Sequence, residues 1–274
     1  ADLYGEPASS LKMAWWDPTK GAYDLYPSPL RTFERGKGYF VKFTAGRELS
    51  RSGVPNDPAV RNQPFEIPLS AAGDGWNLIG NPYDFEIDWT RVTVLHSGEA
   101  LTFADAISQN LIAGSLFGYE PSARDYFIYT SMIPFRGYWV RALADGVTIR
   151  TPADPVNASS QGAVGARSSS PMAKRGVDWS MQLVAQAGEF RDSDNYLGVA
   201  PQDKGIDMRY DLDEPPMARN FADDDVTVYF AATNPDGSAR MLAADFRSGL
   251  GASQTWDVYV DTTLANTDVT LSWP

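Results

Sequence analysis

Acidic side chains gather in the last hundred residues, and they are the best candidates for metal chemistry. Hard oxygen ligands close together in the sequence are what Ca²⁺ requires. The spacing Asp192-x-Asp194-Asn195-x-x-Gly198 is similar to the start of a calcium loop, although the Glu that closes an EF-hand loop is missing. The alternative is that these residues cap turns through Asx hydrogen bonds and keep the surface soluble. The predicted calcium ligands are Asp192, Asp194, Asn195 and Asp211.

Aromatic side chains near turns are candidates for binding sugars. Exposed flat rings can stack on sugar rings, much as they stack on nucleic acid bases. Trp15 and Trp16 are adjacent, so on a strand they face opposite sides, and one can lie near solvent. The alternative is core packing, because Trp and Tyr also fill β-sandwich interiors. The predicted sugar-binding residues are Trp15, Trp16, Tyr23, Tyr119 and Tyr126.

Residues for catalysis are scarce. The single histidine, His96, follows the apolar stretch 92–95, and no Gly-x-Ser-x-Gly motif occurs. The absence of cysteine excludes disulfides, thiolate metal sites and a cysteine nucleophile. Carboxylates are plentiful, but the sequence places no two of them on opposed strand ends, as glycoside hydrolysis would require. We therefore expect a protein that is not an enzyme.

The elements that position these residues occur twice in the chain. Trp16-Asp17-Pro18, Tyr23 and Tyr26 reappear 103 residues later, beginning at Tyr119-Glu120-Pro121. Gly38-Tyr39-Phe40-Val41-Lys42 reappears 99 residues later, as Gly137-Tyr138-Trp139-Val140-Arg141. This pattern predicts duplicated aromatic β modules of about 100 residues. The first copy lacks the opening of the second, so we expect it either to pack on the second copy or to come from a larger repeat array.

Charge separates the chain into two physically different parts. Residues 176–274 contain 17 acids and 6 bases, whereas residues 1–175 contain 18 acids and 17 bases. Neither part offers the basic face that nucleic acid phosphates require. No stretch approaches the roughly 18 apolar residues of a membrane-spanning helix. Ala1 is expected to be a processed or trimmed end, and the chain to be a piece of a longer protein.

Alternation and turn residues predict an all-β fold of tandem sandwich-type modules with one short helix. Thr102 and Asp105 form a capping box for the helix near 102–112, whose apolar stripe is Phe103, Ile107 and Leu111. The predicted domains are a partial aromatic β repeat (1–62), a complete repeat (63–153), a flexible linker (154–175) and an acidic immunoglobulin-like sandwich (176–274).

Residues 176–274 resemble immunoglobulin-like β-sandwich modules from the C-terminal regions of large secreted bacterial proteins. The resemblance rests on Trp179, Leu183, the Asp192 to Gly198 spacing and further motifs, namely Asp211-x-x-Glu214-Pro215-Pro216, Asp245-x-Arg247, Trp256 and Val269-x-Leu271-x-Trp273. Residues 76–154 are similar to the repeat units that often precede such modules. The resemblance implies export and an accessory role beside upstream domains of a larger polypeptide.

Repeated aromatics and the resemblance together favour one function. We expect extracellular or cell-surface accessory modules that bind polysaccharide or cell-surface glycan through exposed aromatics. The first alternative is a structural spacer or anchoring segment that displays an upstream domain. The second alternative is a glycoside hydrolase fragment.

Overall fold

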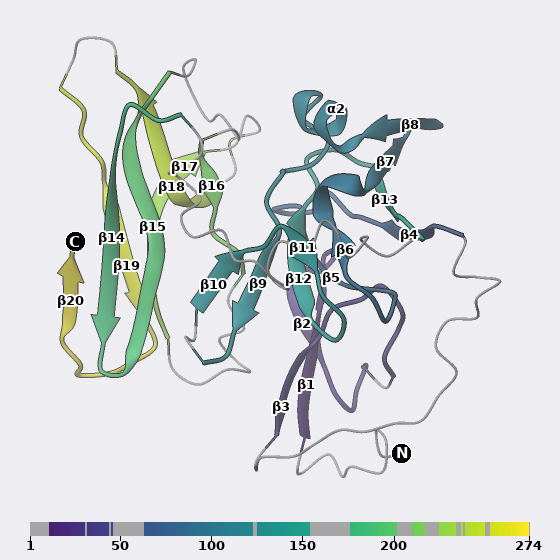
Figure 1. Cartoon of the computed structure of the whole chain (residues 1–274). Coiled ribbons are helices and arrows are strands. Elements are labelled where there is room, and N and C mark those ends of the chain that lie inside the picture. The colour runs from purple at the N-terminus through teal and green to yellow at the C-terminus, as the bar shows by residue number, and fades with distance from the viewer. Residues whose placement is uncertain are drawn as a thin grey trace. The chain divides into compact units, whose positions relative to one another are not determined.

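The computed structural model describes residues 11–30, 32–43, 45, 63–122, 125–153, 176–201, 210–216, 225–233, 237, 239–249 and 253–273. The chain forms two compact units (Figure 1). The first contains Ala1–Gly118 and Tyr129–Arg167, and the second contains Tyr119–Ile128 and Ser168–Pro274. Both predicted repeats therefore contribute to the first unit, although 119–128 groups with the second. The predicted linker at 154–175 lies outside the described residues.

Short strands build residues 11–153, because alternating apolar positions are interrupted by Gly, Pro and Asp turns. The strands pair in four sheets, with the orders β2-β1-β3, β10-β9-β12-β5, β11-β6 and β4-β13-β7-β8. Their bounds are β1 (Leu11–Asp17), β2 (Ala22–Leu25), β3 (Phe40–Phe43), β4 (Phe65–Pro68), β5 (Trp76–Gly80), β6 (Ile87–Asp88), β7 (Thr93–His96), β8 (Glu99–Thr102), β9 (Phe117–Glu120), β10 (Asp125–Ile128), β11 (Ser131–Met132), β12 (Gly137–Arg141) and β13 (Thr148–Thr151).

One α-helix occurs among the described residues, α2 (Phe103–Ser108), besides the single 3₁₀ turn η1 (Trp89–Arg91). The Thr102 hydroxyl accepts a hydrogen bond from the Asp105 backbone N–H at 3.2 Å and donates one to the Asp105 carboxylate at 2.6 Å. The predicted cap is therefore present, although the helix ends four residues earlier than predicted. Together with the sheets, it confirms the predicted all-β, sandwich-type fold with one short helix.

The two copies of the repeated sequence make the same pairings. In each, the first strand is central, its hairpin partner lies on one side and the last strand on the other, as in β2-β1-β3 and β10-β9-β12. The Tyr26 N–H donates to the Met13 carbonyl at 2.9 Å, and the Tyr129 N–H donates to the Leu116 carbonyl at 2.8 Å. The donors of these two bonds are 103 residues apart, and so are the acceptors, so corresponding residues form the same hydrogen bond in both copies.

Later positions of the repeat also correspond. The Tyr39 hydroxyl accepts a hydrogen bond from the Glu34 N–H, and the Tyr138 hydroxyl accepts one from the Ile133 N–H. Burial raises the pKa of the Tyr138 phenol, and this effect exceeds the opposing effect of its hydrogen bond with the Ile133 backbone. Both tyrosines therefore tie the turn before their strand to the strand itself, at the same spacing in each copy.

Strand β5 joins the first copy to the second. β5 pairs with β12 of the second copy, and the Gly38 N–H of the first copy donates to the Leu78 carbonyl at 3.0 Å. The Gly80 N–H donates to the Gly36 carbonyl at 2.9 Å. A Cβ on Gly80 would lie 2.5 Å from the Lys37 carbonyl oxygen, so only glycine allows the backbones this close. The first copy thus packs on the second, which is the first of the two alternatives expected from the sequence.

One position in the turn before the last strand of the repeat has a positive φ in both copies, but it is glycine in the first copy and phenylalanine in the second. Gly36 has φ +81° in the first copy, and Phe135, 99 residues later, has φ +62°. A bulky residue rarely adopts this left-handed conformation. The Phe135 side chain is also fully exposed. Packing within the chain therefore does not compensate for the strain.

Replacing Phe135 with Gly should stabilise the first unit by about 0.5–1 kcal/mol. Relief of the left-handed strain is worth about 1–2 kcal/mol and exceeds the entropic cost of glycine, about 0.5–1 kcal/mol. The measurement is urea unfolding of the full chain. The inverse change, Gly36→Ala, should destabilise it, because the new Cβ would lie 2.6 Å from the Phe65 ring. If Phe135→Gly were less stable than the native chain, the Phe135 ring would contribute more to stability than the strain of its backbone costs.

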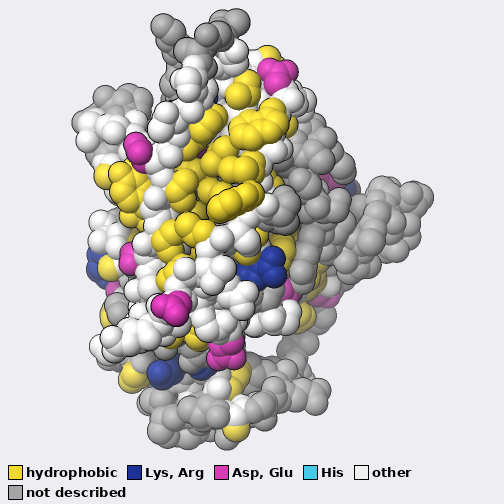
Figure 2. Space-filling view, turned by 90° about the vertical axis from the view of Figure 1, so that its left-hand side faces the viewer, with side chains coloured by type: hydrophobic (Ala, Val, Ile, Leu, Met, Phe, Trp, Pro, Cys, Tyr) yellow, Lys and Arg dark blue, Asp and Glu magenta, His cyan; other side chains and the backbone are white. Residues whose placement is uncertain are grey.

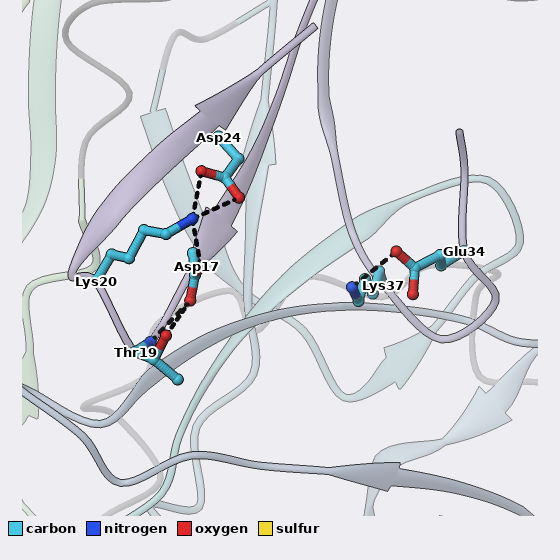
Figure 3. Close-up of polar contacts among 6 residues, drawn as sticks. All are labelled: Asp17, Thr19, Lys20, Asp24, Glu34 and Lys37. Carbon is cyan, nitrogen blue, oxygen red and sulfur yellow. Dashed lines mark hydrogen bonds and ion pairs between the residues drawn. The ribbon is translucent and has the colours of Figure 1, made fainter. Parts of the chain in front are cut away.

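A compact ionic network closes the β1–β2 hairpin (Figure 3). The Lys20 ammonium lies 2.8 Å from the Asp17 carboxylate and 2.9 Å from that of Asp24, and the Thr19 N–H donates to Asp17 at 3.0 Å. Desolvation raises the pKa of Asp17, but the hydrogen bonds from Lys20 and Thr19 outweigh it and lower the pKa to about 2. The network therefore stabilises the hairpin at neutral pH, and this contribution is lost as the pH falls from 3.8 through about 2.

The second unit is a seven-stranded sheet that folds over on itself. Its strand order is β19-β17-β18-β15-β14-β20, with β16 paired to β18, and β15 and β18 run parallel. β17 packs against both β14 and β15, so the two halves of the sheet face each other as layers. The strands are β14 (Trp179–Ala187), β15 (Phe190–Ala200), β16 (Leu212–Asp213), β17 (Val226–Thr233), β18 (Ala239–Ser248), β19 (Val258–Thr262) and β20 (Val269–Ser272).

Alternating side chains from the facing layers form the core of this unit. One cluster contains Leu183, Leu197, Phe230 and Leu242, with Trp256 packed against it. A second cluster contains Ala185, Ala187, Val226 and Val228. This is the alternation that the sequence predicts for a sandwich. The finer assignment to an immunoglobulin-like module stays a prediction.

Candidate functional site

Trp16 and Tyr23, two of the predicted sugar-binding residues, lie together on one face of the β1–β2 hairpin. The Trp16 ring contacts Tyr23 edge to face, with centroids 5.1 Å apart, and contacts Trp139 in the same way at 5.6 Å. The Trp16 indole N–H donates to the Trp76 carbonyl at 2.9 Å. Burial raises the pKa of the Tyr23 phenol above its usual value. These two rings therefore help to build the interior of the first unit.

Trp15 lies apart from that pair and packs against a small cluster that includes Leu11 and Met13. The Lys37 ammonium lies 3.9 Å from the centroid of the half-buried Trp15 ring. One face of the ring is therefore occupied by a cation–π contact. A sugar could stack on that face only by displacing the lysine.

Tyr119 and Tyr126 form another edge-to-face pair, with ring centroids 5.3 Å apart. Tyr126 is buried, and its hydroxyl donates to the Pro216 carbonyl at 3.2 Å. Tyr119 is half-buried. The structure therefore brings the five predicted rings together as two pairs and one separate tryptophan, each packed against other side chains.

The predicted calcium ligands Asp192 and Asn195 lie in the interior of the second unit. Both carboxylate oxygens of Asp192 accept hydrogen bonds at 2.6 Å, one from the Val228 N–H and one from the Asn195 side-chain amide. Asp192 thereby joins β15 to β17, which are not neighbours in the sheet. These hydrogen bonds give the two residues a structural role that does not depend on a metal ion.

The other two predicted ligands make separate contacts. Asp211 is buried, and its carboxylate accepts a hydrogen bond from the Phe246 N–H at 2.7 Å. Asp194 is half-buried, and its carboxylate lies 3.4 Å from the Tyr196 hydroxyl. Within the described part of the chain, no three His, Asp or Glu side chains are arranged to hold a metal ion. Calcium binding stays a prediction.

Replacing Asp192 with Asn should destabilise the second unit by about 1–3 kcal/mol. The new amide would place a donor against the Val228 N–H or the Asn195 amide, leaving a buried group without its hydrogen bond. Asp268→Asn, at an exposed position, is the control and should change little. Thermal melts of both variants and of the native chain, in calcium and in chelator, also test the metal. A calcium-dependent rise in melting temperature that Asp192→Asn abolishes would show that calcium contributes instead.

A different aromatic group lies at the surface of the second unit. Trp179, Val199 and Arg247 occupy paired positions on β14, β15 and β18, so they share one face of the sheet. Trp179 is 48% exposed, and its ring lies 6.2 Å from that of Trp256, which precedes β19. The sheet register therefore places an exposed indole next to a second, half-buried one.

Polar groups border the Trp256 ring. The Arg247 guanidinium lies 5.1 Å from the centroid of the Trp256 ring, and it donates a hydrogen bond to the Asp245 carboxylate at 2.9 Å. It also donates to the Thr255 carbonyl. The Trp256 indole N–H donates to the Asp245 carbonyl at 3.1 Å. The group of Trp179, Trp256, Arg247 and Asp245, called here the Trp179 platform, is thus held in place from several sides.

The chemistry of the Trp179 platform suits a neutral polyhydroxylated ligand. An exposed indole face offers an apolar surface to the C–H groups of a sugar ring. The guanidinium and the carboxylate beside it can donate to and accept from hydroxyl groups. The sequence contained a signal for this group, because Trp179, Trp256 and Asp245-x-Arg247 carry the family resemblance, but nothing in their spacing shows that they meet.

His96, the remaining candidate from the sequence, lies half-buried at the end of β7, where it pairs with Glu99 across the β7–β8 hairpin.

Comparison of the chain with protein-family models, curated proteins and solved structures finds no match. The part of the chain that the structure describes has no helix long and apolar enough to cross a membrane.

Proposed function

We propose that the chain is a non-catalytic glycan-binding region of a secreted bacterial protein, acting beside upstream domains. The observation that carries the proposal is the Trp179 platform, in which an exposed indole lies 6.2 Å from a second indole that is bordered by an Arg–Asp pair. Sugar-binding surfaces need an apolar ring face and hydrogen-bonding groups at its margin, and this group provides both. The extracellular placement rests on the family resemblance alone.

A structural spacer is the second candidate, and a specific observation favours it. The aromatics of the first unit are engaged in packing, since the rings of Trp16, Tyr23 and Trp76 each contact Trp139 edge to face. A spacer needs such cores and no ligand. The two proposals differ only in whether the exposed rings of the second unit bind anything.

One experiment separates the candidates. The full chain is incubated with a panel of insoluble and soluble polysaccharides, and retention and released sugar are measured together. The proposal predicts retention without product, reduced at least tenfold in affinity by Trp179→Ala. Phe135→Ala is the matched control, because it removes an exposed ring from the first unit and should not affect retention. If the protein showed no retention and released no sugar, the result would favour the spacer. Released sugar would overturn the non-catalytic assignment.

A further inference from the structure

The second unit has two edge strands, β19 and β20, that are each paired on one side only and contain apolar side chains. β19 and β20 are the two ends of the strand order, and no described strand pairs with the outer edge of either. Only residues 263–268 separate them in the sequence, and the facing layers of the sheet bring both edges to one side of the unit. Figure 2 shows hydrophobic side chains gathered on the side of the molecule where β14, β19 and β20 lie in Figure 1.

These exposed side chains belong to the core face of the sheet. Val258 and Val260 pair with Phe230 and Val228, which are 1% and 0% exposed, yet they are themselves 36% and 38% exposed. On the other edge, Val269 and Leu271 pair with Ala187 and Ala185, which are fully buried, yet they are 36% and 39% exposed. The core-facing side chains of both edge strands therefore stay partly exposed, although Leu264 of the segment between them packs against the inner cluster.

Neither edge strand contains a lysine, a proline or a bulge, three of the features that normally prevent pairing with other chains, although both strands are short and β19 contains Asp261. Natural edge strands use lysine, proline, bulges or a covering loop to block the addition of a strand. β19 has the sequence Val-Tyr-Val-Asp-Thr and β20 has Val-Thr-Leu-Ser, with no lysine, no proline and a regular register. An edge of this kind is suited to β-augmentation, in which an extended peptide adds a strand and fills side-chain positions on the core face.

The negative charge at and beside β19 and β20 indicates what kind of chain can bind to these edges. The sequence contains no Lys or Arg from Ser248 to Pro274, and the acidic residues Asp257, Asp261 and Asp268 are exposed at or beside these strands. A second copy would bring like charges together, which is unfavourable. We propose that the β19–β20 edge binds an extended segment of a partner protein in which apolar residues alternate with Lys or Arg. The apolar side chains of the segment cover the exposed valine and leucine side chains of β19 and β20, and the basic ones meet the aspartates.

The test uses the full chain and synthetic peptides. A fluorescent nine-residue peptide of alternating valine and lysine is titrated with the protein, and anisotropy gives the affinity. A serine–lysine peptide of the same charge and a valine–glutamate peptide of the same apolar content are the controls. The proposal predicts that the valine–lysine peptide binds at least tenfold more tightly than either control, and that added salt weakens the binding.

Variants locate the peptide on the protein. Val260→Lys, at an exposed edge position, should reduce the affinity for the valine–lysine peptide at least tenfold. Thr233→Lys, at the exposed end of β17, should leave it within twofold. Equal binding of the serine–lysine peptide, or an unchanged affinity for Val260→Lys, would overturn the proposal. A native dimer that Val260→Lys converts to a monomer, measured by sedimentation, would also overturn it in favour of a second copy.

Discussion

Replacing Trp139 with Ala should destabilise the first unit by about 3–5 kcal/mol, the usual cost of truncating a buried tryptophan. The Trp139 side chain is 1% exposed, and its ring contacts Trp16, Tyr23 and Trp76 edge to face. The truncation would remove one ring from each of these pairs and leave a cavity between the two copies of the repeat. The measurement is urea unfolding of the full chain.

Two further variants show whether the loss comes from packing. Trp139→Phe should retain most of the stability, since the first copy has Phe40 at the equivalent position. Trp179→Ala should cost less than about 1 kcal/mol, because that side chain is half exposed. A loss below about 1 kcal/mol for Trp139→Ala would contradict the assignment of the repeated aromatics to the core.

Replacing Arg240 with Met should destabilise the second unit by about 3–5 kcal/mol. The Arg240 guanidinium lies 2.5 Å from the Asp213 carboxylate, and the two side chains are 8% and 2% exposed. Removing the arginine leaves a buried carboxylate without its ion-pair partner, which costs far more than the pair itself contributes. Thermal unfolding of the second unit gives the measurement.

The double variant Arg240→Met with Asp213→Leu should recover most of this loss, because it removes both charges and keeps apolar volume. Arg150→Met is the contrasting control, since its pair with Glu66 is exposed and worth less than about 1 kcal/mol. If the double variant were as unstable as Arg240→Met, the buried pair would not be the cause.

The sequence predicted the elements better than the surroundings of the side chains. The strand alternation and the Thr102 cap are local patterns, and both appear in the structure close to their predicted places. The duplication of an aromatic module stays a prediction, although the two segments have corresponding strand orders. The environment of Trp16 could not be predicted in this way, because it depends on β5 entering between the copies. The same limit applies to Asp192, since its carboxylate accepts a hydrogen bond from Val228, which lies 36 residues along the chain.

The residues of the Trp179 platform could be identified in the sequence, but their proximity could not be predicted. Trp179 is far in sequence from both Arg247 and Trp256, and only the parallel pairing of β15 with β18 brings Trp179 and Arg247 to one face. A parallel pair between distant strands leaves no local signature, whereas a hairpin does. The residues were visible in the sequence, but their juxtaposition was not.

The dissociation constant for a retained polysaccharide, measured by affinity electrophoresis, is the direct test of glycan binding by the Trp179 platform. The native chain is compared with Trp179→Ala and with Trp15→Ala, which truncates a ring that the sequence alone would have chosen. We predict that Trp179→Ala raises the dissociation constant at least tenfold, about 1.4 kcal/mol, while folded Trp15→Ala stays within twofold of the native chain. A dissociation constant that is unchanged in Trp179→Ala and raised in Trp15→Ala would contradict the account.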